Sequence, residues 1–278
     1  MKRTLESKVE LDLINSSLWK NKLLNDCKAQ NVFLAIRDNK IGFYHKGGLL
    51  FSFDKFGYKT HIKYAAVIPS NGRDYLTEAE LSEHKLSPDF ESNYSRIKEN
   101  CSKYSGIEDD TVSKIYHKHS YLSNSEIVIL DIEVSFKSFD EEKYQDRIDI
   151  LLFNKKTQTL KFVEAKHYSN KEIWSRTTPK VIGQINKYEN QIKQRTPAIL
   201  KEYVGYVKTI NTLFEKDLPE PLKIDPKVTL LIFGFDNDQL KGKLKNLIIN
   251  KVEYEGINVY PRGSISSNFS TTTLWNIK

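Results

Sequence analysis

The sequence predicts a mixed α/β fold in which a small β-rich module precedes a larger core with helices on both faces of a sheet. From residue 126 onward, apolar and amphipathic segments follow in the order strand, strand, strand, helix, helix, strand, helix. Before them, residues 31–68 hold short segments rich in β-branched and aromatic residues, separated by polar turns, which predicts an antiparallel meander. We therefore expect an N-terminal module over 1–75 and a core domain over 76–278.

The N-terminal module begins with about 25 residues that favour a helix, or a helix and a turn. The meander then follows as four segments, NVFLAIRD, KIGFYHK, GLLFSFD and THIKYAAVI. The chain becomes polar and helix-prone after it, with helices expected over 91–104 and within 108–122.

The core domain should open with strands over 126–136, 147–153 and 159–166, of which the last two form a hairpin across the turn 154–158. Helices are expected next, and a central strand, a further helix and an edge strand after them. These elements are a helix over 180–194, a second one over 198–214 opened by Pro197, the strand 228–235, a helix over 236–249 capped by Asp236 or Asn237, and the strand 257–263.

The composition argues against several classes of protein. No apolar run approaches the roughly 18 residues that a membrane span requires. The charged start of the chain lacks the apolar stretch of a signal peptide. Only Cys27 and Cys101 are present, which argues for a reducing compartment and against a disulfide framework. We expect a cytoplasmic protein without a membrane partner.

Basic residues are concentrated in two segments. The net charge is +7, and residues 1–68 hold 12 basic and 6 acidic side chains, whereas residues 166–208 hold 9 and 3. Such segments suit a polyanion, because Lys and Arg release counterions from phosphate backbones. The meander also interleaves basic with aromatic residues, which could stack bases, although ordinary turns or a dimerisation surface would give the same pattern.

Charged residues interrupt the apolar hairpin of the core. Asp149 lies in its first strand, and Glu164 and Lys166 lie in its second. Alternate residues of a strand share a face, so Glu164 and Lys166 project together, and pairing of the strands would bring Asp149 close to Glu164. Two adjacent carboxylates repel each other, and Mg²⁺, which takes one or two carboxylates as ligands, relieves this repulsion. A structural salt bridge on an exposed sheet face would give the same sequence pattern.

An Asp on one strand followed by Glu-x-Lys on the next resembles the PD-(D/E)XK nuclease superfamily, the fold of many restriction endonucleases and RecB-type nucleases. Here the residues are Asp149 and Glu164-Ala165-Lys166. The order helix, three strands, helix, strand over roughly 91–235 matches the core of that superfamily. The RecB-type branch also carries Gln-x-x-x-Tyr on the following helix, and this chain has Gln184 and Tyr188 there.

The chain also departs from the pattern of the superfamily. No Pro precedes the Asp, since Arg147 and Ile148 stand there. The superfamily often adds a Glu from its first helix. Three candidates stay open for this role: Glu99, Glu108 and Glu133, the last of which interrupts an apolar strand.

The resemblance implies a metal-dependent nuclease that hydrolyses phosphodiester bonds, with DNA as the expected substrate and defence against foreign DNA as a role. Asp149, Glu164 and the backbone carbonyl of Ala165 would hold Mg²⁺, for which Mn²⁺ would substitute. Lys166 would position the attacking water, and Gln184, Tyr188 and Glu133 would complete the catalytic set.

Two alternatives have other consequences: a non-cleaving nucleic-acid-binding protein of the same fold, and a nuclease gated through the N-terminal module by a partner or a small-molecule signal. Double-strand cutting by one such site per chain needs two chains or two successive nicks. A homodimer is therefore an expectation.

Overall fold

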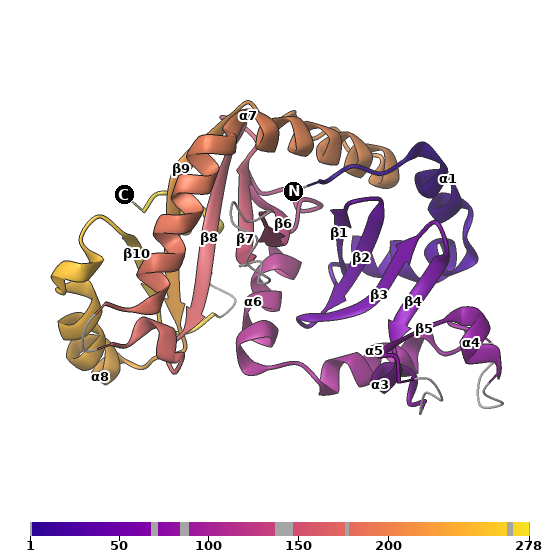
Figure 1. Cartoon of the computed structure of the whole chain (residues 1–278), viewed down its shortest axis with the longest axis horizontal. Helices are drawn as coiled ribbons and strands as arrows, with labels where there is room; N and C mark the ends of the chain where they lie inside the picture. Colours follow the sequence, from indigo (N-terminus) through magenta and orange to yellow (C-terminus); the bar gives the residue numbers. More distant parts are fainter. Residues whose placement is uncertain are drawn as a thin grey trace. The chain divides into compact units, whose positions relative to one another are not determined.

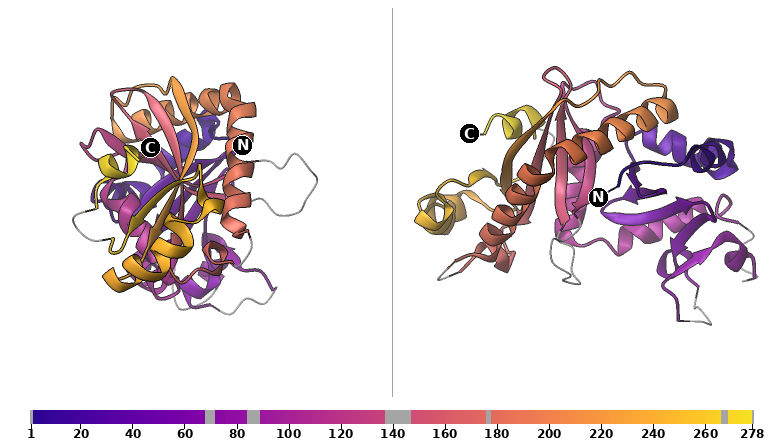
Figure 2. Two further views of the ribbon diagram at one scale, coloured as in Figure 1. Left: turned by 90° about the vertical axis from the view of Figure 1, so that its left-hand side faces the viewer. Right: turned by 45° about the horizontal axis from the view of Figure 1, so that its top comes forward.

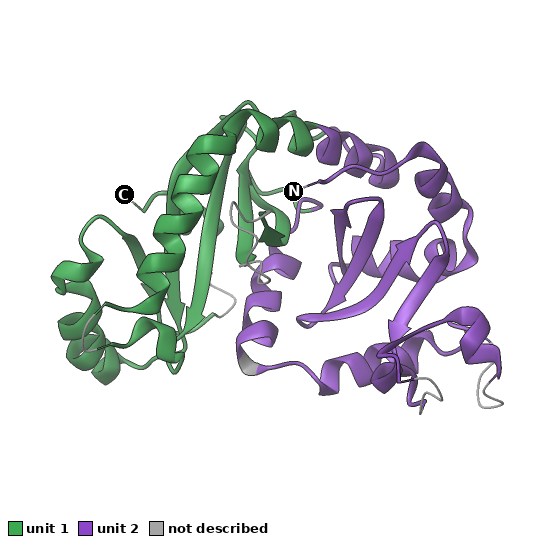
Figure 3. Cartoon of the chain, viewed as in Figure 1, with its two compact units in different colours: residues 1, 123–204, 218–278 green, residues 2–122, 205–217 purple. Residues whose placement is uncertain are grey.

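The computed structural model describes residues 2–67, 72–83, 89–136, 147–175, 178–265 and 269–277. These residues form two five-stranded sheets, one antiparallel and one mixed, together with helices (Figures 1 and 2). Each sheet belongs to its own compact unit. Unit 1 comprises 123–204 and 218–278, and unit 2 comprises 2–122 and 205–217 (Figure 3). The predicted mixed α/β class is confirmed.

Unit 2 contains the antiparallel meander, whose strands follow the order β1-β2-β3-β4-β5. The strands are β1 (Phe33–Arg37), β2 (Lys40–His45), β3 (Gly48–Asp54), β4 (Gly57–His61) and β5 (Tyr75–Thr77). The helices are α1 (Ser7–Asn15), a π-helical turn (Trp19–Leu23), α2 (Leu24–Lys28), α3 (Ile62–Ala65), α4 (Glu78–Glu83), α5 (Tyr94–Lys103) and α6 (Ile107–Lys118).

The fourth strand of the meander is shorter than the sequence predicts. The segment 60–68 was expected to be extended, but β4 ends at His61 and α3 follows. The His61 ring caps this helix by accepting a hydrogen bond from the Lys63 amide, and Ala66 ends it in the left-handed conformation, with φ of 57°. Local side-chain capping therefore outweighs the β-propensity of the apolar residues in this segment.

The division between the units lies at 122/123 and differs from the expected boundary at 75/76. The reason is aromatic packing between the helices and the meander. The Phe51 ring of β3 stacks on Tyr94 of α5 with centroids 6.1 Å apart, and Phe33 of β1 meets Tyr116 of α6 at 5.3 Å. These helices therefore complete the core of the N-terminal unit.

Unit 1 contains the mixed sheet, in the order β10-β9-β8-β7-β6. Neighbours are antiparallel from β6 to β8 and parallel from β8 to β10. The strands are β6 (Ile127–Ser135), β7 (Arg147–Asn154), β8 (Thr159–His167), β9 (Lys223–Phe233) and β10 (Asn258–Arg262). The helices are the 3₁₀ turn η2 (Lys171–Ile173), α7 (Lys180–Phe214), of which residues 205–214 belong to unit 2, α8 (Asn237–Gln239) with its π-helical continuation η3 (Leu240–Ile249), the 3₁₀ turn η4 (Val252–Tyr254) and α9 (Thr271–Trp275).

The strands of this sheet follow the predicted order, and Asp236 caps α8. Residues 228–233 of β9 are all buried, as expected of a strand covered on both faces. The charged loop expected at 137–145 lies outside the described residues. In the part of the chain that the structure describes, no helix is long and apolar enough to cross a membrane.

The two helices expected over 180–194 and 198–214 are one continuous helix, α7, with Pro197 inside it. Proline removes one backbone hydrogen bond and usually kinks or ends a helix. Here Ile192 and Ile199 are buried on either side of the proline, and the Thr196 hydroxyl donates to the Ile192 carbonyl at 2.8 Å. Tertiary packing and a local side-chain bond therefore hold the helix together across the proline.

Helices cover both faces of the mixed sheet. On one face, the Tyr203 hydroxyl of α7 donates to the carboxylate of Asp131, which lies opposite Leu151 of β7. On the other face, the Lys161 ammonium reaches the backbone carbonyls of Trp275 and Ile277, at and beyond the end of α9. Asp149 is two residues from Leu151 and therefore projects from the same face of the sheet. Glu164 and Lys166 project from the face opposite to that of Lys161. Asp149, Glu164 and Lys166 therefore lie on the α7 face, and Lys161 does not.

The bond between Tyr203 and Asp131 should contribute measurably to stability. Both side chains are fully buried, and the hydroxyl–carboxylate distance is 2.9 Å. We expect Tyr203→Phe to lower the free energy of unfolding by about 2 kcal/mol, because it leaves a buried oxygen of Asp131 without this donor. Tyr206→Phe is the matched control, because that hydroxyl makes a 3.5 Å bond to the neutral Leu34 carbonyl. Equal losses in urea denaturation of the two variants would contradict the assignment.

Candidate active site

The β7–β8 hairpin brings the Asp149 and Glu164 side chains to opposite positions on neighbouring strands. Ile150 pairs with Val163, so the next pair along the hairpin is Asp149 and Glu164. The Asp149 carboxylate accepts a 2.7 Å hydrogen bond from the Ala165 amide. Directly opposed residues of an antiparallel pair project from the same face, so both carboxylates belong to one site.

Glu164 is the most strongly perturbed carboxyl group of this site. It is only 2% exposed, and its Oε2 is buried without a hydrogen-bond partner. Burial, followed by the negative charge of Asp149, raises the pKa of Glu164 well above its ordinary value, and the Lys166 ammonium offsets this only in part. A buried carboxyl group with a raised pKa beside a second carboxylate is typical of a functional site.

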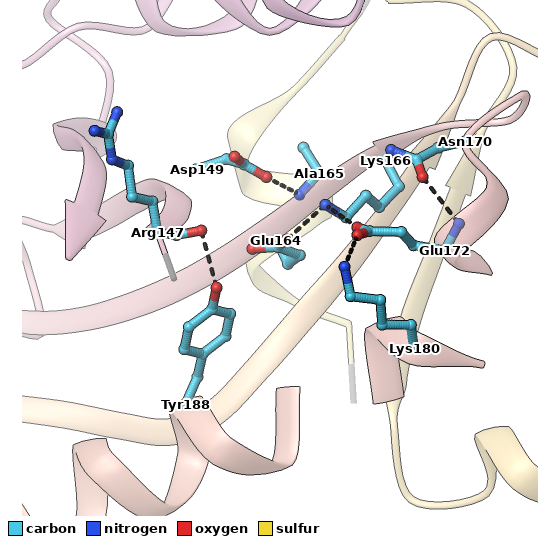
Figure 4. A network of polar contacts seen from close by, with 9 residues as sticks. All are labelled: Arg147, Asp149, Glu164, Ala165, Lys166, Asn170, Glu172, Lys180 and Tyr188. Carbon is cyan, nitrogen blue, oxygen red and sulfur yellow. Dashed lines mark hydrogen bonds and ion pairs between the residues drawn. The ribbon is translucent and has the colours of Figure 1, made fainter. Parts of the chain in front are cut away.

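Lys166 is held between two carboxylates (Figure 4). Its Nζ lies 3.0 Å from Glu164 Oε1 and 3.0 Å from Glu172 Oε2. Burial alone would lower the pKa of Lys166, but the charges of Glu164 and Asp149 outweigh burial and raise it. Lys166 therefore carries a positive charge at neutral pH and acts as a hydrogen-bond donor there, rather than as a base.

Glu172 is a member of the site that sequence reasoning missed. It lies in η2, where the Asn170 side chain accepts from the Glu172 amide at 3.0 Å, and its second oxygen contacts Lys180 at 2.6 Å. Burial opposes ionisation, but the bonds from Lys180 and Lys166 prevail and lower the pKa of Glu172. The Asn-x-Glu spacing of residues 170–172, a sequence typical of a capped turn, was the available signal.

Tyr188 lies where the first part of α7 meets β7. Its hydroxyl donates to the Arg147 carbonyl at 3.0 Å, two residues before Asp149 (Figure 4). Gln184 lies one helical turn earlier, and its side-chain oxygen is buried without a hydrogen-bond partner. Tyr188 thus ties α7 to the strand that carries Asp149, and Gln184 holds an acceptor atom available for a donor.

Glu133 lies opposite Asp149 on the other neighbouring strand, between Ile132 and Val134, which pair with β7. Its φ of 46° is unusual for a residue other than glycine, and such backbone strain is often found at functional sites. Its carboxylate contacts the Arg147 guanidinium at 3.1 Å.

The other two acidic candidates, Glu99 and Glu108, belong to unit 2, whereas Asp149 and Glu164 belong to unit 1. Glu99 forms an exposed ion pair with Lys103 at 2.9 Å.

The donor atoms fit a hard divalent cation. Mg²⁺ commonly takes one or two carboxylates and completes its coordination with water and substrate. Asp149 and Glu164 supply two carboxylates from one sheet face, and Glu164 Oε2 is an acceptor without a partner. Within the described ranges, no set of three or more His, Cys, Asp or Glu side chains is grouped to hold a metal. Two carboxylates are the number that Mg²⁺ commonly takes from a protein.

No family model, no curated protein and no solved structure matches this chain.

The Glu172 carboxylate should position the Lys166 ammonium without touching the substrate. Glu172→Gln removes one charge partner of Lys166. In an assay of the metal-dependent phosphodiester cleavage that the resemblance implies, we expect it to lower the rate about 10-fold, as is typical for partners that orient the groups of a metal site. Glu255→Gln, at an exposed position of the same unit, should leave the rate unchanged. Equal rates for Glu172→Gln and the unaltered protein, measured across pH, would exclude the positioning role.

Proposed function

We propose that this protein is a metal-dependent nuclease of the PD-(D/E)XK type that hydrolyses phosphodiester bonds in DNA. The observation that carries the proposal is that Asp149 lies opposite Glu164 on the neighbouring strand, and that the Glu164 carboxylate is buried, incompletely bonded and next to the charged Lys166. A buried charge set of this kind rarely benefits stability alone. Its presence in the core therefore supports a chemical role.

The residues that would hold the cation are Asp149, Glu164 and the backbone carbonyl of Ala165. Bound Mg²⁺, or Mn²⁺ in its place, supplies Lewis-acid stabilisation of the charge that develops on the phosphoryl oxygens. The repulsion between the two carboxylates, which contributes to the raised pKa of Glu164, supplies part of the driving force for cation binding.

The side chains around the cation site have separable tasks. Lys166 donates hydrogen bonds to the attacking water or to the phosphoryl oxygens, and its positive charge stabilises the transition state. Gln184 orients a donor of the substrate or of ordered water through its unsatisfied oxygen. Tyr188 fixes the start of α7 against β7, which keeps Gln184 in register with Asp149.

The substrate is assigned as DNA from charge and from the superfamily that the motifs resemble. Helix α7 carries basic residues along its length, which provide phosphate contacts. They are Lys180, Lys187, Lys193, Arg195, Lys201 and Lys208. Contacts of this kind give affinity without sequence preference.

The proposal is tested by incubating the protein with supercoiled plasmid, linear duplex and single strands, each with Mg²⁺, with Mn²⁺ and with EDTA. Metal-dependent cutting is expected, and nicking of the closed plasmid would identify an endonuclease. Binding without cutting under every metal condition would overturn the proposal in favour of a non-cleaving binder. RNA strands of the same sequence establish whether cleavage is restricted to DNA.

A further inference from the structure

An aromatic and cationic cluster lies directly beyond the candidate active site in unit 1. The Tyr168 and Trp174 rings meet edge to face, with centroids 5.0 Å apart and planes at 75°. The Trp174 indole N–H donates to the Tyr168 carbonyl at 2.7 Å. The Lys243 ammonium lies 4.1 Å from the Trp174 ring centroid and 6.0 Å from that of Tyr168. We call these three residues the aromatic platform.

Two residues of the platform lie close in sequence to the charged residues of the site. Tyr168 follows Lys166 by two residues, and Trp174 follows Glu172 by two. The Tyr168 amide donates to the Phe233 carbonyl at 2.7 Å, which places the platform at the carboxyl ends of the parallel strands β8 and β9. Ligands of open α/β sheets bind outside this end of the strands.

Two glycines allow the chain to hold the platform in place. Gly234 has φ of 79°, and a Cβ there would lie 2.2 Å from the His167 ring. A Cβ at Gly263 would lie 2.6 Å from the Phe235 carbonyl oxygen. This close approach positions the Phe235 ring, whose centroid lies 6.2 Å from that of Tyr168. The platform is thus fixed by the ends of β8, β9 and β10.

Core packing does not account for these rings. Aromatic side chains that only fill the core of this unit, such as Phe153 and Phe162, are fully buried, whereas Tyr168 and Trp174 are half-buried. The Lys243 ammonium adds a positive charge at the ring surface. Partly exposed aromatic rings combined with a lysine are the features that bind single-stranded nucleic acid, through base stacking and phosphate contact.

We infer that the aromatic platform receives an unpaired nucleobase of the strand bound at the candidate active site, while Lys243 contacts a phosphate of that strand. This inference rests on the proposed nuclease function and specifies its substrate class. A paired base is stacked inside the duplex and cannot reach the rings. The protein therefore binds single-stranded or frayed DNA in preference to closed duplex.

Binding is measured by fluorescence anisotropy in EDTA, where no cleavage occurs. The probes are a labelled single strand, its duplex, and a strand of equal charge in which abasic sites replace the nucleotides. We expect Trp174→Ala and Tyr168→Ala each to weaken binding of the ordinary single strand about 10-fold, the effect of losing one stacked base. Their affinity for the abasic strand should be unchanged, because its phosphates are intact.

A control variant and a measurement on the unaltered protein distinguish loss of base stacking from misfolding of a variant. Tyr104 lies in unit 2 and is 59% exposed, and the Lys63 ammonium lies 5.7 Å from its ring centroid. The Tyr104→Ala variant therefore loses a similar ring away from the platform, and it should bind single strands normally. In the unaltered protein, the ordinary strand should quench Trp174 fluorescence and the abasic strand should not. Trp174→Phe, which keeps a ring, should retain binding and lose this quenching.

Three results would each overturn the inference. The alanine variants could lose equal affinity for the ordinary and the abasic strand, or both could keep the affinity of the unaltered protein. Quenching of tryptophan fluorescence could also persist in Trp174→Phe. Failure of the nuclease proposal gives a different result. In that case the unaltered protein would not cut DNA with Mg²⁺ or Mn²⁺, while stacking on the platform in EDTA would still be observed.

Discussion

Lys166→Ala is expected to reduce metal-dependent DNA cleavage by at least about 10²- to 10³-fold, the usual cost of removing one preorganised donor from a transition state. The ammonium stands beside the Glu164 carboxylate at 3.0 Å and is held charged by it. Alanine removes the donor and leaves the buried carboxylate without its partner. Single-turnover cleavage of a labelled strand, with binding measured in parallel in EDTA, separates the chemical step from affinity.

Lys156→Ala is the matched control, because that lysine is exposed in the turn at the far end of the same hairpin. It should cut at the unaltered rate. Affinity for DNA should change little in either variant, since one of many phosphate contacts is lost at most. Cleavage by Lys166→Ala at the unaltered rate would refute the site assignment.

Asp149→Asn is expected to abolish both cleavage and the stabilisation of the fold by Mg²⁺. A ligand at 100 times its dissociation constant stabilises the folded protein by about 2.7 kcal/mol. The unaltered protein should therefore unfold at a temperature several degrees higher in Mg²⁺ than in EDTA, and Asp149→Asn should show no difference. Asp238→Asn, at an exposed position in α8, should respond to Mg²⁺ like the unaltered protein.

The pH dependence of this stabilisation is set by Glu164. Its pKa is raised, and only the ionised carboxylate binds the cation, so Mg²⁺ stabilisation should weaken as the pH falls through that raised value. In the metal-free protein the sign is opposite. The contribution of Glu164 to stability is then present below its ordinary pKa and is lost as the pH rises through the raised pKa.

Mg²⁺ stabilisation of Asp149→Asn equal to that of the unaltered protein would rule out this cation site.

The sequence pattern predicted strands β6 to β9 because each has eight residues or more and a run of buried apolar residues. The hairpin register also follows from the sequence, since the short turn between Asn154 and Thr159 leaves little freedom in pairing. Alternation then places Asp149, Glu164 and Lys166 on one face. Residues close together on two consecutive strands are the part of a site that sequence reasoning resolves best.

Features that depend on tertiary packing could not be predicted in this way. The helix break expected at Pro197 was wrong, because buried isoleucines on both sides outweigh the local cost of proline. Glu172 was missed because its role depends on where a short 3₁₀ turn places its carboxylate, next to Lys166. Single-residue propensities contain no information on either contact.

The continuity of α7 determines how the two units can be studied and how they can evolve. Its last turns belong to unit 2, where Phe214 meets Trp19 at 5.6 Å and Tyr121 at 5.9 Å. Neither unit is therefore a contiguous stretch of chain. A fragment beginning at residue 123 would expose the apolar end of this helix to water and should aggregate. The N-terminal unit cannot be removed by a simple truncation, so its contribution must be measured by surface substitutions in the intact chain.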